Sequence, residues 1–209
     1  MKKFIFDLDN TLYPASLQVF PLIDRRINLY MTRKLGIPEA EVDGLRRLYW
    51  KLYGVTLNGL MRHYRVDPED YLRYVHDVDL STLLKPNLRL RSSLEKIPVP
   101  KVIFTNGSSA HAQNVLSALD IEHLFDDIFD VRVAGFLPKP LREPYHKVLD
   151  LMNVSGQECV MVDDIPENLK TAKAMGMKTI LVGSSNGHEY IDFCVEKACG
   201  VSEIIELLQ

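Results

Sequence analysis

Short runs of Val, Ile, Leu and Phe recur along this chain, and stretches with the apolar spacing of an amphipathic helix separate them. This alternation constrains the fold most, because parallel strands joined by helices are buried on both faces and therefore have nearly continuous apolar sequences. It predicts an α/β chain with a Rossmann-like, doubly wound parallel sheet. The expected strands lie in KFIFDLD, KVIFTNG, DIFDV, ECVMVDD and KTILVG, at 3–9, 101–107, 127–131, 158–164 and 178–183.

Helix signals follow several of these runs. Ser108 or Ser109 can cap a helix after the second run, and Pro166 is suited to the first turn of a helix after the fourth. Ser202 is expected to cap a last helix that continues to the end of the chain.

The segment from residue 16 to 84 has a different pattern, with helical apolar spacing throughout and no strand alternation. Asp67 followed by Pro68 is typical of a helix start inside it. We therefore expect an all-helical insertion after the first strand. It would form a cap domain of residues 16–84, while residues 1–15 and 85–209 would form the core domain.

Composition and charge exclude several classes of protein. A formal net charge of −3 and a pI near 6.1 leave no broad basic surface for nucleic acid or for an anionic membrane. The three cysteines lack zinc-ligand spacing, and the apolar run after Lys2 and Lys3 is too short for a signal peptide. These features favour a cytoplasmic enzyme or binding protein with a small-molecule partner, and they imply no particular oligomeric state.

Polar side chains stand where the expected strands end. Asp7 and Asp9 point to the same side of an extended chain and repel each other unless a cation lies between them. Ligands of open α/β sheets bind at the carboxyl ends of the strands, so groups from the other strands should meet these aspartates. The groups are Thr105, Asn106 and Gly107 after the second strand, Lys139 after the third, and Asp163 and Asp164 at the fourth. Clustered carboxylates suit Mg²⁺, and the lysine, the threonine hydroxyl and the Gly107 N–H suit a phosphate group.

Each of these features has an ordinary alternative when it is considered alone. Two aspartates at a strand end can form a turn, a single lysine is usually on the surface, and Asp163 with Asp164 can cap a helix. Their joint occurrence at successive strand ends favours one shared site.

The same residues resemble the motifs of the haloacid dehalogenase (HAD) superfamily. DLDNT is similar to its first motif, Thr105 to the second, Lys139 to the third and DDIPEN to the fourth, and the helical insertion resembles its C1 cap. The resemblance extends over essentially the whole chain. DLDNTLYP, YGVTLNGL, VHDVDL and IFTNG further resemble the pyrimidine 5′-nucleotidase-like branch.

The resemblance implies a Mg²⁺-dependent phosphatase that works through an aspartyl-phosphate intermediate. Asp7 would be the nucleophile, and Asp9 the general acid and base. The Asp7 carboxylate, the backbone carbonyl of Asp9 and the Asp164 carboxylate would bind the metal, with Asp163 and Asn168 supporting them from behind. The groups expected to bind phosphate are Thr105, Asn106, Gly107 and Lys139.

Asp9 favours a phosphatase over a dehalogenase. An alkoxide leaving group needs a proton, whereas a halide leaves without one, and the dehalogenases of the superfamily lack an acid at that position. A response-regulator receiver uses similar groups, but in another order along the chain and without a helical insertion. A non-catalytic binding protein is a second alternative.

Discrimination between leaving groups should come from the helical insertion, because the carboxylate site contacts only the phosphoryl group. The insertion contains side chains that can stack on a base or bind its edge, although each aromatic residue can instead belong to a packed core. The candidates are Tyr53, Asn58 and His63, with Tyr13 at the hinge, beside Tyr49, Trp50 and Tyr64. Together with the branch resemblance they favour a pyrimidine nucleotide such as UMP or CMP. Phosphoglycolate or a sugar phosphate is the alternative substrate.

Overall fold

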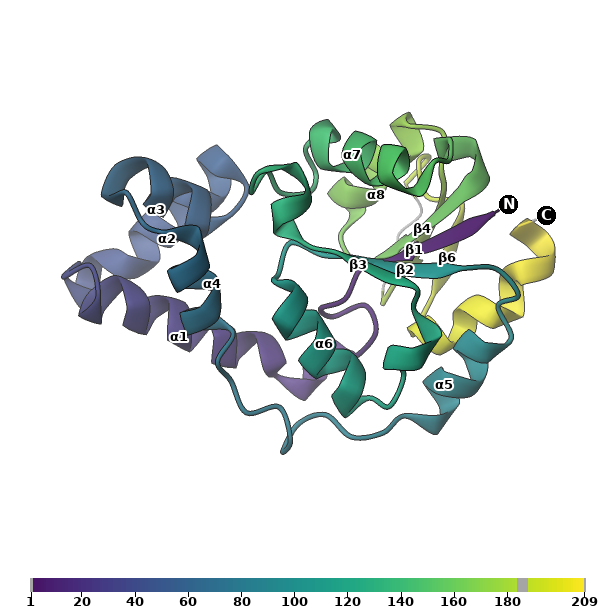
Figure 1. The fold of residues 1–209 in the computed structure, drawn as a ribbon, viewed down its shortest axis with the longest axis horizontal. Coiled ribbons are helices and arrows are strands. Elements are labelled where there is room, and N and C mark those ends of the chain that lie inside the picture. The colour runs from purple at the N-terminus through teal and green to yellow at the C-terminus, as the bar shows by residue number, and fades with distance from the viewer. Residues whose placement is uncertain (1, 184–187, 209) are drawn as a thin grey trace.

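The computed structural model of the protein describes residues 2–183 and 188–208, and a parallel sheet of six strands forms its centre (Figure 1). The strand order is β3-β2-β1-β4-β5-β6. The strands are β1 (Lys3–Phe6), β2 (Lys101–Phe104), β3 (Asp127–Phe129), β4 (Cys159–Asp163), β5 (Lys178–Val182) and β6 (Phe193–Val195). The α/β class and the parallel sheet are confirmed, and β6 is additional to the strands expected from the sequence.

The direction of strand addition reverses at β1. The chain builds β2 and β3 on one side of it, and β4, β5 and β6 on the other. Phe6 is in register with Ile103 of β2 and with Val162 of β4, so the carboxyl ends of these neighbouring strands lie close together. A reversal of this kind leaves a crevice outside the strand ends, which is where open α/β sheets bind ligands. The residues that follow β1, β2 and β4 therefore share one location.

Helices cover both faces of the sheet because its strands are apolar on both sides. Phe4 and Phe6 belong to one face, and Ile5 between them belongs to the other. The first face is covered by α5 (Leu88–Glu95), α6 (Ser109–Ala118) and η5 (Ala198–Leu208). The second face is covered by α7 (Arg142–Met152) and α8 (Pro166–Ala174), which lie above the sheet in Figure 1. Ser108 caps α6 and Pro166 opens α8, as predicted.

Between β1 and β2 the described chain forms helices and no strand. Besides α5 they include α1 (Val19–Arg33), α2 (Glu39–Tyr53), α3 (Thr56–Tyr64) and α4 (Pro68–Val75), and these four helices lie to one side of the sheet (Figure 1). The Asp67 carboxylate caps α4 by accepting a hydrogen bond of 2.9 Å from the backbone N–H of Glu69. The exact division between a core of residues 1–15 and 85–209 and a cap of residues 16–84 stays a prediction.

Short 3₁₀ helices complete the connections. They are η1 (Ala15–Leu17), η2 (Glu122–Leu124), η3 (Val131–Ala134) and η4 (Gly156–Glu158). No helix in the described parts of the chain is long and apolar enough to cross a membrane.

The last helix differs from the sequence expectation. It begins at Ala198, so Ser202 lies inside it and is not its cap. The hydroxyl of Ser93 on α5 lies 2.7 Å from the carbonyl oxygen of Cys199 and 2.9 Å from the hydroxyl of Ser202. The Ser202 hydroxyl therefore contacts α5, which is distant in sequence, and does not cap the start of its own helix.

Gly156 provides a test of how tightly the α8–β5 turn packs. A Cβ atom at this position would lie 1.9 Å from the carbonyl oxygen of Met175, whereas a Cβ at Gly44 on the exposed side of α2 would meet no atom within 4 Å. Gly156→Ala should therefore lower the free energy of unfolding by about 3 kcal/mol, because backbone must move. Gly44→Ala should raise it by about 1 kcal/mol through helix propensity. Urea unfolding of both variants checks the pair, and equal effects would contradict the packing argument.

Candidate active site

The predicted residues at the strand ends come together at one edge of the sheet. Asp7 follows β1, Thr105 follows β2, and Asp163 is the last residue of β4. One carboxylate oxygen from each of Asp7, Asp163 and Asp164 lies within 4.8 Å of the others. Three carboxylates at this separation repel one another strongly unless cations lie among them.

Lys139 supplies one of the cationic charges. Its Nζ donates hydrogen bonds to Asp7 Oδ1 at 2.7 Å, to Asp163 Oδ2 at 3.0 Å and to the carbonyl oxygen of Phe104 at 2.7 Å. Burial lowers the pKa of Lys139, but the two carboxylates outweigh burial and raise the pKa above its usual value. The side chain is buried and all its donors are used, so this lysine is part of the site and not of the surface.

Asp163 holds Lys139 in place. Besides the lysine it accepts hydrogen bonds from the Asn168 side chain at 3.1 and 3.0 Å and from the backbone N–H of Ile165 at 2.8 Å. Because both of its oxygens are occupied and the residue is fully buried, Asp163 is suited to support neighbouring groups from behind. Asn168 acts on the site through Asp163 in the same way.

The negative charges of Asp7 and Asp164 are less fully compensated by hydrogen-bond donors than that of Asp163. The hydroxyl of Thr11 lies 3.0 Å from Asp7 Oδ2 and 3.2 Å from Asp164 Oδ1, and one hydroxyl proton satisfies only one of them. Burial, opposed by Lys139 and aided by Asp163 and Asp164, raises the pKa of Asp7 to about 8. Burial and Asp163 raise the pKa of Asp164 to about 6. Hard oxygen donors with excess negative charge fit a divalent cation such as Mg²⁺.

Asp9 lies beside this cluster and has its own partners. The Tyr13 hydroxyl donates to Asp9 Oδ1 at 2.5 Å, and His111 Nε2 lies 2.8 Å from the same oxygen. Burial raises the pKa of Asp9, but His111 and the Tyr13 hydroxyl together lower it below its usual value. Asp9 is therefore ionised in this geometry, which is the form that a general base needs, and it has to gain a proton before it can act as a general acid.

His111 is the functional candidate that sequence reasoning missed. It is fully buried on α6, and its backbone N–H donates to the Ser108 hydroxyl that caps this helix. The available signal is its position: the first turn of a helix that follows a strand of an α/β sheet lies at the ligand-binding edge.

A histidine from the helical insertion reaches the same place. The ring of His76, which follows α4, stacks on His111 with centroids 4.7 Å apart and planes at 16°. Its Nδ1 lies 2.9 Å from the Ser108 hydroxyl. Burial and the neighbouring His111 lower the pKa of His76 to about 4, so this ring is neutral near pH 7.

The predicted phosphate-binding loop is only partly available for a ligand. The sequence suggested a free N–H at Gly107 for a phosphate group. In the structure this N–H donates to Thr105 Oγ1 at 2.9 Å, so the expectation is wrong. The Asn106 side chain binds the backbone of Lys139 on both sides, donating to its carbonyl at 3.0 Å and accepting from its N–H at 2.7 Å. A Cβ at Gly107 would lie 3.3 Å from Thr105 Oγ1 and 3.7 Å from His76 Nε2. Asn106 thus fixes the loop that carries Lys139, and Gly107 leaves space that a side chain would fill.

The specificity candidates fall into two places. Tyr13 is buried against Asp9 and faces the carboxylate site. Tyr53, Asn58 and His63 form a separate cluster, in which the Tyr53 hydroxyl lies 2.9 Å from His63 Nε2 and Asn58 Nδ2 donates to the Tyr53 carbonyl at 3.3 Å.

The residues next to this cluster show where it lies in the fold. Tyr49 is buried and stacks on His63, whereas the Trp50 side chain is 70% exposed. Gly54, next to Tyr53, packs so closely on Pro138 that a Cβ there would lie 2.9 Å from the proline Cγ. Because Pro138 precedes Lys139, the cluster borders the loop that carries Lys139.

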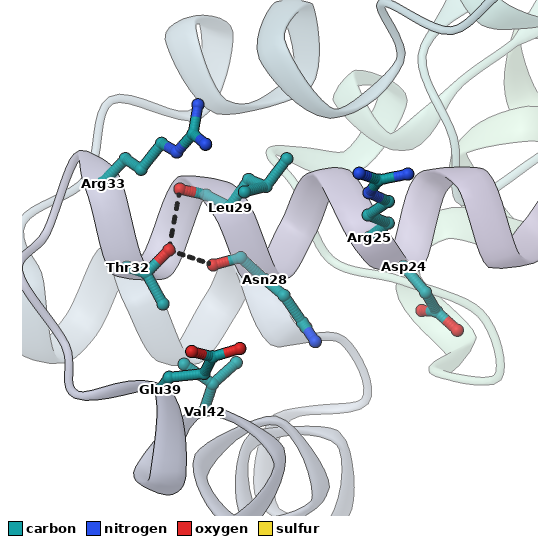
Figure 2. Close-up of a pocket in the computed structure, with 8 residues that line it drawn as sticks. All are labelled: Asp24, Arg25, Asn28, Leu29, Thr32, Arg33, Glu39 and Val42. Carbon is teal, nitrogen blue, oxygen red and sulfur yellow. Dashed lines mark hydrogen bonds between the residues drawn. The ribbon is translucent and has the colours of Figure 1, made fainter.

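Two grooves lie outside the carboxylate cluster. One of them, of about 710 Å³, lies along α1. Figure 2 shows its lining residues, among them Thr32, whose hydroxyl lies within hydrogen-bond distance of the carbonyls of Asn28 and Leu29. None of the residues that line it belongs to the site. A second groove of about 580 Å³ lies between α4 and α6 and is bordered by His76 and His111. The second groove therefore adjoins Asp9, and the first does not.

Comparison with known proteins agrees with this arrangement. Residues 1–176 match the haloacid dehalogenase-like hydrolase family. The chain belongs to this family. The strand-end residues thus lie in the core of a HAD-like hydrolase, and the resemblance inferred from the sequence is confirmed at the level of the family.

Individual relatives differ in their described activity. The chain is 29% identical over 197 residues to Phosphate metabolism protein 8 of Saccharomyces cerevisiae, and the match covers 86% of this chain but only 61% of the yeast protein. It is 26% identical over 195 residues to Hexitol phosphatase A of Escherichia coli, covering 88% and 83% of the two chains. The solved structure of L-2-haloacid dehalogenase from Xanthobacter autotrophicus matches with a TM-score of 0.64 and 16% identity, over 99% and 98% of the chains. That likeness shows a common fold, which does not decide the reaction.

Proposed function

We propose that this HAD-like hydrolase is a Mg²⁺-dependent phosphatase that acts on phosphate monoesters through an aspartyl-phosphate intermediate. The observation that carries the proposal is Asp9, two residues after Asp7 and hydrogen-bonded to Tyr13 and His111. A carboxyl group held beside the nucleophile can protonate an alkoxide, which dehalogenation does not require.

The residues divide the reaction between them. An oxygen of Asp7 attacks phosphorus while the bond to the ester oxygen breaks, and Asp9 gives that oxygen a proton. Water then attacks the phosphorus of the aspartyl-phosphate, Asp9 takes the proton, and Asp7 is released. Lys139 and the Thr105 hydroxyl stabilise the negative charge of the transferring phosphoryl group.

The Asp7 and Asp164 carboxylates and the backbone carbonyl of Asp9 would hold Mg²⁺. When it is bound, the ion neutralises charge on the carboxylates and on the phosphoryl oxygens. Lys139 compensates only part of the negative charge of Asp7, Asp163 and Asp164, and the raised pKa values of Asp7 and Asp164 are consistent with a missing positive charge. Asp163 and Asn168 would support the ligands and Lys139.

Removal of the metal should abolish turnover. Protein treated with excess chelator is expected to have no detectable activity on para-nitrophenyl phosphate, and Mg²⁺ should restore it and raise Tm, since the ion binds the folded state. Ca²⁺ should restore little activity, because a larger ion with more ligands can engage both oxygens of Asp7. Full activity in excess chelator would contradict the metal proposal.

For the substrate we propose a pyrimidine nucleoside 5′-monophosphate. Tyr53 and His63 offer rings that can stack on a base, and Asn58 has an amide that can bind its edge, beside the loop that carries Lys139. A sugar phosphate is the second candidate, favoured by the likeness to Hexitol phosphatase A. Phosphoglycolate is a third and smaller acid to test.

A panel of esters separates these substrates. We expect kcat/KM for UMP and CMP to exceed the values for AMP, phosphoglycolate and hexitol phosphates by about ten- to a hundredfold. Asn58→Ala should lower kcat/KM for UMP far more than for para-nitrophenyl phosphate, while Trp50→Ala, at an exposed position on α2, should change neither. A preference for a hexitol phosphate would select the second candidate, and no turnover of any ester would favour a binding protein.

We propose a cytoplasmic location for this enzyme. The described cysteines, Cys159, Cys194 and Cys199, are free thiols, as expected in a reducing compartment. Its partner would then be a small phosphorylated metabolite.

A further inference from the structure

The two hydrogen bonds to Asp9 end on the same oxygen atom. Tyr13 and His111 both bind Oδ1, at 2.5 and 2.8 Å, and no hydrogen bond from a described residue reaches Oδ2. The two oxygens of the carboxyl group are therefore unequal. Oδ1 is occupied by two donors, and Oδ2 has no hydrogen-bond donor among the described residues.

Both partners are fixed in position. The Tyr13 side chain is 2% exposed, and burial and Asp9 raise the pKa of its hydroxyl, so it remains a donor. His111 is 0% exposed, and its Nε2 carries the hydrogen because a carboxylate only accepts. Both donors to Asp9 are therefore buried in the interior of the protein.

The other ring nitrogen of His111 is left without a hydrogen bond to any described residue. Its Nδ1 is buried without a hydrogen-bond partner, and His76 covers the ring face while Ser108 holds His76. A buried unpaired nitrogen is unfavourable by about 1–3 kcal/mol. Packing alone would be served equally well by an apolar ring, so the bond from Nε2 to Asp9 is the contact that this histidine adds.

We propose that Tyr13 and His111 are positioning residues that hold Asp9 by Oδ1, so that Oδ2 is the oxygen that exchanges the proton. This inference rests on the proposed phosphatase function and specifies its acid–base step. As the Asp7–phosphorus bond forms, the electron pair of the breaking phosphorus–oxygen bond passes to the ester oxygen, which takes the proton that Oδ2 has first gained from solvent. In the second half, water attacks phosphorus and gives its proton to Oδ2, and the electron pair of the aspartyl-phosphate bond returns to Asp7.

Leaving groups that differ in their need for a proton provide the test. Para-nitrophenolate leaves without protonation, whereas the alkoxide of an alkyl phosphate does not. In His111→Ala and in Tyr13→Phe, kcat/KM for the alkyl ester turned over fastest by the wild type should fall by about a hundredfold, and kcat/KM for para-nitrophenyl phosphate by less than about threefold. Hydrolysis of the intermediate still needs the base, so kcat for para-nitrophenyl phosphate should fall and a burst of para-nitrophenolate should appear.

Three controls separate the possible outcomes. His123→Ala, at an exposed position, should behave as the wild type, and His111→Gln, which keeps a donor, should recover part of the alkyl-ester activity. Asp9→Asn tests the proposed function itself: if it retains alkyl-ester turnover, the acid–base role of Asp9 is wrong. Suppose that Asp9→Asn lowers kcat/KM for the alkyl ester far more than for para-nitrophenyl phosphate, but His111→Ala and Tyr13→Phe lower both values equally. The two residues are then only structural, and the positioning role is overturned.

Discussion

An Asp7→Asn variant is expected to hydrolyse phosphate esters at least about a thousandfold more slowly than the wild-type protein. The amide keeps the shape of the carboxyl group but cannot attack phosphorus, so no aspartyl-phosphate forms. The variant should nevertheless remain folded. Lys139 keeps its bonds to Asp163 and to the Phe104 carbonyl, and one of three mutually repelling carboxylates is removed.

The measurement therefore combines turnover with stability. We expect Tm of Asp7→Asn in the presence of chelator to equal or exceed that of the wild type, because Asp7 is buried with a pKa raised to about 8 and its charge is unfavourable there. Asp150→Asn, at an exposed position on α7, is the matched control and should retain full activity. Activity of Asp7→Asn within tenfold of the wild type would exclude Asp7 as the nucleophile.

Lys139→Met should affect both stability and activity. The substitution keeps most of the side-chain length but leaves Asp7 and Asp163 buried without their cation, and breaking a buried ion pair in this way costs about 3–5 kcal/mol. For a chain of this size that loss corresponds to a decrease in Tm of about 6–20 °C. Turnover should fall by about a hundredfold or more, since the positive charge that stabilises the transferring phosphoryl group is also lost.

Mg²⁺ distinguishes this electrostatic account from a simple loss of packing. Because the variant has three neighbouring carboxylates and no lysine, Mg²⁺ should raise its Tm by more than it raises that of the wild type. Lys147→Met on the exposed side of α7 should leave Tm and activity unchanged. If Lys139→Met is as stable as the wild type in chelator, the lysine does not compensate the buried carboxylates.

Local patterns in the sequence accounted for the elements that position the site. Apolar runs identified β1, β2, β4 and β5, because a strand buried on both faces needs apolar side chains at successive positions. Ser108, Asp67 and Pro166 marked helix starts, since capping depends on residues only a few positions apart. The location of Asp7 and Asp163 at neighbouring strand ends followed from the rule that ligands bind at the carboxyl edge of a parallel sheet.

Some features of the site have no local signal. The bonds from Thr11 to Asp164 and from His111 to Asp9 join residues 153 and 102 positions apart. The sequence suggested a free N–H at Gly107, but in the fold this N–H donates to the Thr105 hydroxyl. Each of these contacts depends on a side-chain direction that the packing of whole helices decides.

The sequence by itself determined the fold class, the carboxylates at the strand ends and the family resemblance, because periodicity, capping and motif order are properties of neighbouring residues. Tertiary structure alone decided which group each polar atom binds. In the folded chain both oxygens of Asp163 accept hydrogen bonds, and Lys139 lies between the carboxylates of Asp7 and Asp163. His76 of the helical insertion stacks on His111. The physical reason is that burial makes every unpaired polar group costly, so the final hydrogen bonds are set by all the elements that pack around the site together.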